Sequence, residues 1–212
     1  LKDLGVPEEK LLEVGILLIN TQMAGLLIGG FVWGIWGDKM GRVSVLFGSI
    51  LLYSVANIAN GFVETVPQYA VLRFIAGIGL AGELGAGITL ASELLPKQWR
   101  GLGTTFIATF GVLGAVFAAA VAELTDWRTA YIIGGVMGLA LLVLRMQVRE
   151  STLFKAINKK GKNVKRGNLL MLFKPPLVKK FIAVIPPSLP IWGVIGLFIT
   201  FTPEFAKGFG MT

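Results

Sequence analysis

Residues 73–85 read RFIAGIGLAGELG, an apolar, glycine-rich stretch with a cation at one end and an acid near the other. It lies inside a hydrophobic run over 68–92, long enough to cross the hydrocarbon of a membrane, which takes a helix of about 20 residues. A charged side chain in hydrocarbon costs at least about 2.5–3.5 kcal/mol. We therefore expect Arg73 and Glu83 to face a cavity on the pathway of a substrate or proton.

Helical geometry separates these two charged residues. Ten residues of helix place Glu83 about 15 Å deeper in the membrane than Arg73 and about 80° away around the axis. They are expected to border one cavity without pairing directly. An apolar environment favours the neutral form of a carboxylic acid, so Glu83 is the candidate proton carrier. The alternative is a permanently protonated glutamate that joins two helices through a hydrogen bond.

Four glycines share this helix with the charges. Small residues let a neighbouring helix approach closely, because they hold no side chain between the two backbones. We expect this packing role for Gly77, Gly79, Gly82 and Gly85.

The whole chain has the composition of a membrane protein. Of its 212 residues, 54% are hydrophobic and 15% are charged, whereas about 25% are charged in a soluble domain. Besides 68–92, five hydrophobic runs are long enough to span a bilayer: 14–36, 43–63, 102–122, 129–148 and 181–203. The expected fold is an all-α polytopic membrane protein, a bundle with six transmembrane helices and the lipid bilayer as its surroundings.

The chain contains neither cysteine nor histidine. Their absence excludes disulfides, Cys/His zinc sites and mechanisms in which a histidine activates a nucleophile. We expect no metal, no cofactor and no enzymatic activity.

The charges alternate in sign from loop to loop. The connections that follow 14–36, 68–92 and 129–148 are basic, whereas the N-terminus and the other connections are acidic. Basic loops face the cytoplasm. The chain is therefore expected to be a multi-pass protein of the plasma membrane, which in bacteria is the inner membrane, with both of its ends outside.

One basic segment is much longer than the other loops. Residues 149–180 are rich in lysine and are interrupted by Gly161, Gly167 and Pro175–Pro176. We expect an inter-domain loop between a transmembrane domain over 1–148 and the start of a second one over 181–212. Its cations either set the topology or attract anionic lipid headgroups. Nucleic acid is not an expected partner, because no recognition motif accompanies the lysines.

Two further motifs lie at span ends. Residues 34–42 read GIWGDKMGR, a tight turn in which glycines allow the reversal and Asp38 is an acid within a basic loop. Such an acid should have a specific partner, either a cation or the amides of a helix N-terminus. The run over 68–92 ends in the pattern Glu93-x-x-Pro96-x-x-x-Arg100-Gly101.

Together with Arg73-x-x-x-Gly77-x-Gly79, these motifs resemble three signatures of the major facilitator superfamily, in the order and topology of that family. The resemblance implies helices two to six over 1–148, the central cytoplasmic loop over 149–180 and helix seven over 181–203. Helix one and helices eight to twelve have no counterpart. The chain is therefore expected to be a fragment of a protein about twice as long.

The resemblance also implies a conformational latch. In the family, the loop acid and arginine help to hold the inner ends of the two halves together in the outward-open state. That role falls on Asp38 and Arg42, in a turn built on Gly34 and Gly41. Glu93 and Arg100 would support it from the end of the third run. The alternative is that Lys39 and Arg42 only satisfy the positive-inside rule.

The expected function is secondary active transport of a small polar solute by alternating access. The candidate substrates are an organic acid, a zwitterionic metabolite or a sugar, with H⁺ as the coupling ion in a symport. Residues 82–85, which read GELG, resemble the metabolite:proton symporters slightly more than the sugar porters. The alternative is a transport-incompetent receptor or scaffold that kept the fold. The sequence leaves the identity of the substrate and the oligomeric state open.

Overall fold

The computed structural model describes residues 1–147, 167, 173–175, 177–194, 196 and 201–209. The chain forms two compact units, Leu1–Gly167 and Asn168–Thr212. The expected loop over 149–180 lies largely outside the described residues, so the division into 1–148, 149–180 and 181–212 stays a prediction.

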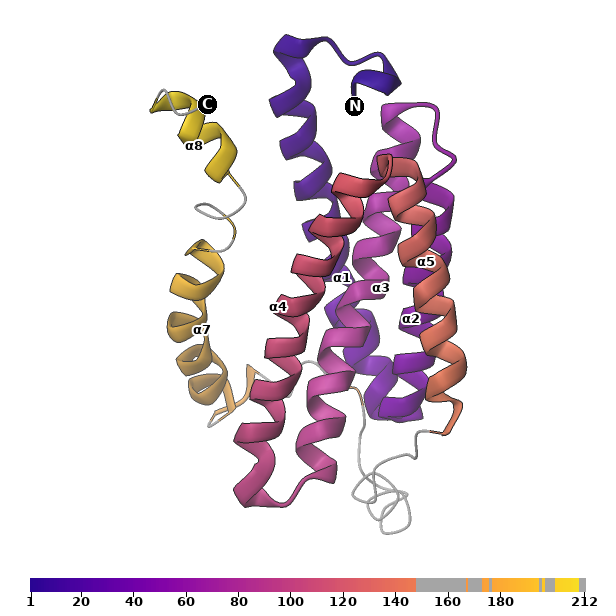
Figure 1. Cartoon of the computed structure of the whole chain (residues 1–212). Coiled ribbons are helices and arrows are strands. Elements are labelled where there is room, and N and C mark those ends of the chain that lie inside the picture. The colour runs from indigo at the N-terminus through magenta and orange to yellow at the C-terminus, as the bar shows by residue number, and fades with distance from the viewer. Residues whose placement is uncertain (148–166, 168–172, 176, 195, 197–200, 210–212) are drawn as a thin grey trace. The chain divides into compact units, whose positions relative to one another are not determined.

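Five long helices form the first unit (Figure 1). They are α1 (Leu11–Met40), α2 (Arg42–Asn60), α3 (Val66–Leu94), α4 (Arg100–Leu124) and α5 (Trp127–Leu144). Single 3₁₀ turns flank them at Lys2–Leu4, Glu8–Lys10, Lys97–Trp99 and Arg145–Gln147. All five helices are long and apolar enough to cross a membrane. The expected all-α, membrane-spanning fold is confirmed, with no strand among the described residues.

The second unit contains α7 (Leu177–Gly193) and α8 (Thr202–Gly208). Helix α7 covers the first part of the sixth expected span, 181–203, and carries three prolines in its interior. Residues 195 and 197–200 of that span lie outside the described residues. The five spanning helices therefore all belong to the first unit.

Local sequence signals explain where the helices begin and end. Gly41 has φ 101°, a left-handed value that a side chain disfavours, and it separates α1 from α2 without any intervening loop. Thr65 caps α3 by accepting a hydrogen bond from the Gln68 N–H, and Pro67 occupies the first turn. Asp126 caps α5 in the same way, through the Thr129 N–H.

Helix α3 lies at the centre of the packing. It runs against both α1 and α2, and α5 packs on the other side of α2. Helix α4, in contrast, has no buried residue within the described part of the chain. The contact of α3 with its neighbours thus positions the charged residues of the bundle.

Glycines bring the backbone of α3 close to those of α1 and α2. A Cβ on Gly77 would collide with the carbonyl oxygen of Gln22, and one on Gly79 would lie 2.7 Å from the Tyr53 amide nitrogen. A Cβ on Gly82 would lie 2.7 Å from the indole ring of Trp33. Gly85 differs from the expectation, because it is exposed and has no described neighbour within 4 Å of a Cβ position. It belongs to the wall of a cavity and not to a described helix contact.

The packing makes a prediction about matched glycine variants. Gly79→Ala should destabilise the complete protein by about 1–3 kcal/mol, because the methyl group meets backbone atoms that cannot move aside cheaply. Gly85→Ala is the control, with the same change in helix propensity but open space around it. The free energy of unfolding in detergent would be measured for both variants. Equal stabilities would contradict the close contact between α2 and α3.

Candidate functional site

Three charged residues, Arg73, Glu83 and Glu93, lie ten residues apart along α3. The spacing corresponds to about 15 Å along the helix axis for each step. Each of the three meets side chains from a different part of the bundle.

Near the N-terminal end of α3, which the loop charges predict to be its outer end, the Arg73 guanidinium lies between two tyrosine rings. Its central carbon is 5.7 Å from the ring centroid of Tyr69 and 5.5 Å from that of Tyr131. The two tyrosine hydroxyls are 2.7 Å apart, and Trp127 contacts both rings. The buried Arg73 Nε has no hydrogen-bond partner within the described residues. Cation–π contacts thus stabilise this charge without neutralising it.

These aromatic residues were not identified from the sequence. The signal for them is helical spacing, since Tyr69 precedes Arg73 by four residues and Trp127 precedes Tyr131 by four. Pairing between α3 and α5 required the tertiary structure.

The start of α5 is held in place by several polar contacts. Arg128 Nη1 donates to the Gly61 carbonyl oxygen at 3.2 Å, and Trp127 Nε1 donates to Asp3 Oδ2 at 2.8 Å. Asp126 accepts hydrogen bonds from the hydroxyl and the N–H of Thr129, and these bonds hold the pKa of the Asp126 carboxyl below its usual value. The aromatic residues that surround Arg73 are therefore fixed from the outer side.

In the middle of the bundle, Glu83 pairs with Arg145. Arg145 Nη2 lies 2.8 Å from Glu83 Oε1, and the two side chains are 28% and 25% exposed. Arg145 directly follows α5, and the sequence alone did not predict that it has an acidic partner within the bundle. The side chain is long enough to reach back from the inner end of α5 to Glu83.

Glu83 also lines a cavity of about 560 Å³ between α2, α3, α4 and α5. The walls are mainly apolar, with Tyr53, Asn57 and Tyr131 as further polar lining residues. Arg73 is not among the lining residues but contacts the Tyr131 ring from outside the cavity. Of the two charged residues, only Glu83 lines this cavity, and the expectation that both border one cavity stays a prediction.

At the inner end, Arg42 joins two acids. Its Nη1 lies 3.0 Å from Asp38 Oδ1 and its Nε lies 3.6 Å from Glu93 Oε1. Arg42 and Glu93 are both largely buried, whereas Asp38 is about half exposed. The network ties the turn between α1 and α2 to the inner end of α3. Arg100 points elsewhere, and its Nε donates to the Leu95 carbonyl oxygen at 3.1 Å.

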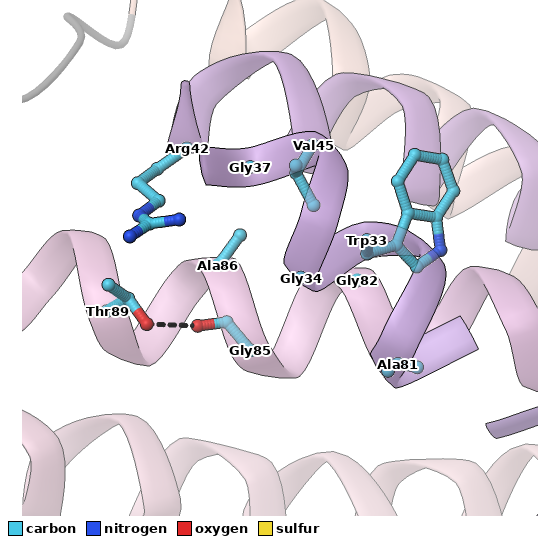
Figure 2. Close-up of a pocket in the computed structure, with 11 residues that line it drawn as sticks. Trp33, Gly34, Gly37, Arg42, Val45, Ala81, Gly82, Gly85, Ala86 and Thr89 are labelled. Atoms are coloured by element: carbon cyan, nitrogen blue, oxygen red, sulfur yellow. Dashed lines mark hydrogen bonds between the residues drawn. The ribbon is translucent and has the colours of Figure 1, made fainter. Parts of the chain in front are cut away.

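A smaller cavity of about 180 Å³ lies beside Arg42 (Figure 2). Glycines form much of its wall, among them Gly34 and Gly37 from α1 and Gly82 and Gly85 from α3. The Thr89 hydroxyl at its edge donates to the Gly85 carbonyl oxygen at 2.7 Å. The cavity leaves room beside the charged network for a movement of the helix ends.

The described residues contain no group of three or more acids, histidines or cysteines that could hold a metal ion. The charged groups of the bundle instead form separate clusters at three depths.

Known proteins of similar sequence identify the family of this chain. The model of the Major Facilitator Superfamily matches residues 10–212. The chain belongs to the major facilitator superfamily. One similar protein is the niacin transporter NiaP of Acinetobacter baylyi, with 31% sequence identity to this chain. The alignment covers 63% of this chain and 31% of the length of NiaP. The sialic acid transporter NanX of Escherichia coli is 30% identical over 77% of this chain and 42% of its own length.

The fold is that of solved superfamily members. The proton:xylose symporter XylE superposes with a TM-score of 0.69 at 18% identity, over 99% of this chain and 56% of the XylE chain. This chain spans about a third to two fifths of the length of the curated relatives NiaP and NanX. NiaP, NanX and XylE are all named as transporters or symporters.

The capping contact of Asp126 predicts a pH effect. Its folded-state pKa is lowered from 3.8, so the stabilisation is fully present above pH 3.8 and is lost as the pH falls through the lower, folded-state value. Asp126→Ala should lower the unfolding temperature at neutral pH, whereas Asp126→Asn, a good capping residue, should lower it less. Thermal unfolding followed by tryptophan fluorescence would show both effects. If the difference in unfolding temperature between wild type and Asp126→Ala stayed the same well below pH 3.8, the assignment of this stabilisation to the ionised Asp126 carboxyl would be contradicted.

Proposed function

We propose that the complete protein is a secondary active transporter of a bacterial inner membrane, and that it moves a small polar solute by alternating access in symport with protons. The observation that carries the proposal is the set of charged side chains on α3, two of which lie well inside a membrane-spanning helix. Charge at that depth is costly, and it is usually found on substrate or ion pathways.

An organic acid is the substrate class that Arg73 suits best. Its guanidinium is held by aromatic rings and keeps its positive charge unneutralised by any described acid. The names of several relatives denote transport of organic acids, including niacin, sialic acid and 4-hydroxybenzoate. A sugar or a zwitterionic metabolite is the other candidate, and XylE, which is named as a xylose symporter, supports the sugar.

Proton coupling is assigned to Glu83. It is a carboxyl group within a span and it lines the larger cavity, where a proton could neutralise it. The chain has no histidine, so a carboxyl group is the side chain of this chain best suited to carry a proton within the membrane. XylE is named as a proton symporter, which supports the same mode of coupling.

Glu83→Gln tests this assignment in the complete protein. We expect uptake driven by a pH gradient into proteoliposomes to fall to background, because the amide cannot exchange a proton. Exchange of external for preloaded substrate should continue. Glu123→Gln, an exposed position near the outer end of α4, is the control and should leave both activities unchanged.

A screen of organic acids, zwitterions and sugars on the wild-type protein would come first. Undiminished gradient-driven uptake by Glu83→Gln would remove Glu83 from the mechanism. Absence of uptake and exchange for every solute would instead favour the receptor or scaffold.

We also propose that the inner network of Asp38, Arg42 and Glu93 is the latch that holds the inner ends together in the outward-open state. Its support is geometric, since Arg42 links the α1–α2 turn to the end of α3 beside a glycine-lined cavity. Arg100 has a different role in this proposal and stabilises the turn after α3 through the Leu95 carbonyl.

A labelling experiment tests the latch. A single cysteine at Thr89, in a cysteine-free background, reports access to the cavity from the cytoplasmic side. Asp38→Asn and Arg42→Gln should each raise its labelling rate by an impermeant maleimide severalfold, because the inner ends separate more often. Lys39→Gln in the same turn is the control. Unchanged labelling in the folded variants would rule the latch out.

A further inference from the structure

Glu83 and Arg145 lie at similar distances from the starts of their respective helices. Helices α3 and α5 run in the same direction, from the top to the bottom of Figure 1. Glu83 is 17 residues after Val66, and Arg145 is 18 residues after Trp127, the first residue of α5. These separations correspond to about 26 Å and about 27 Å of helix. The ion pair thus joins comparable positions along two helices that run in the same direction.

Arg145 is the one charged side chain in contact with Glu83 in the described part of the chain. The other titratable groups around the cavity are Tyr53 from α2 and Tyr131 from α5, and α4 contributes only apolar residues to its wall. Arg73, on the same helix as Glu83, lies about 15 Å away along the axis. The charge state of Glu83 is thus felt mainly by Arg145.

The pair is incomplete on the arginine side. Nη2 contacts the carboxylate, but the buried Nη1 has no hydrogen-bond partner within the described residues. Loss of the negative charge on Glu83 would leave a partly buried guanidinium without its acceptor, which is unfavourable. Because Arg145 lies at the inner end of α5, its side chain can turn toward the cytoplasmic surface instead.

We propose that Arg145 is a positioning residue of the proton site: it holds ionised Glu83 against the inner end of α5, and proton binding to Glu83 releases that end. The proton neutralises the Glu83 carboxylate and the ion pair breaks, with no other bond formed or lost. This inference rests on the proposed role of Glu83 in proton coupling. Beyond that role, it identifies α5 as the helix that moves when Glu83 binds a proton.

A spin label at position 146 of the complete protein, in a cysteine-free background, tests the release of α5. Met146 adjoins Arg145 and is 71% exposed, so a label there should be tolerated. The mobility of the label in wild type should rise as the pH is lowered. Glu83→Gln and Arg145→Gln should each give high mobility at every pH, and the double variant should be no more mobile than either. Arg145→Lys should restore the pH response, because lysine keeps the positive charge. The control for loss of a charge is Lys97→Gln, on an exposed turn after α3, and it should leave the pH response of the label unchanged.

Transport gives the second readout. Arg145→Gln should lose accumulation driven by a pH gradient and keep exchange, whereas Arg145→Lys should keep both. A label whose mobility ignores pH in folded wild type, or additive effects of the two neutral variants, would overturn the inference. A pH-dependent label in a wild-type protein that accumulates no substrate would support the inference about α5 and reject the proposed symport, so the two failures are distinguishable.

Discussion

The close approach of α3 to α1 and α2 determines where the charged groups of this bundle lie. At Gly77, Gly79 and Gly82 the neighbouring main chain or an indole ring occupies the space that a side chain would need. Helices in a membrane gain little from burying apolar surface, so this contact between backbones is the main source of their attraction. It holds α3 rigidly enough for charges on its other faces to meet fixed partners.

Those partners differ with depth. Arg73 is surrounded by aromatic rings, which leave its charge available to an anion. Glu83 is neutralised by one cation, Arg145, and Glu93 shares Arg42 with Asp38. In the proposed mechanism the outer cluster would bind the substrate, the middle pair would take up the proton, and the inner network would hold helix ends together.

Such a division suits alternating access. A substrate anion at Arg73 and a proton at Glu83 would act on opposite ends of one helix, because Arg73 contacts Tyr131 near the start of α5 and Glu83 contacts Arg145, directly after the end of α5. Helix α5 is thus the element on which both ligands could act. In this interpretation α5 would transmit the coupling, and α3 would provide the fixed support.

The sequence by itself determined five membrane-spanning segments, because long apolar runs separated by loops of alternating charge are typical of a chain that crosses a bilayer repeatedly. It also identified Arg73, Glu83 and the residues of the inner network as unusual, since charge in hydrocarbon and an acid in a basic loop each need a partner. It did not show which partner. The tyrosines around Arg73, the pairing of Glu83 with Arg145 and the separation of Arg73 from the larger cavity were decided only by the tertiary structure. The physical reason is that the spacing along one helix determines depth and direction, whereas contact between helices depends on how glycine-lined faces rotate and pack against one another.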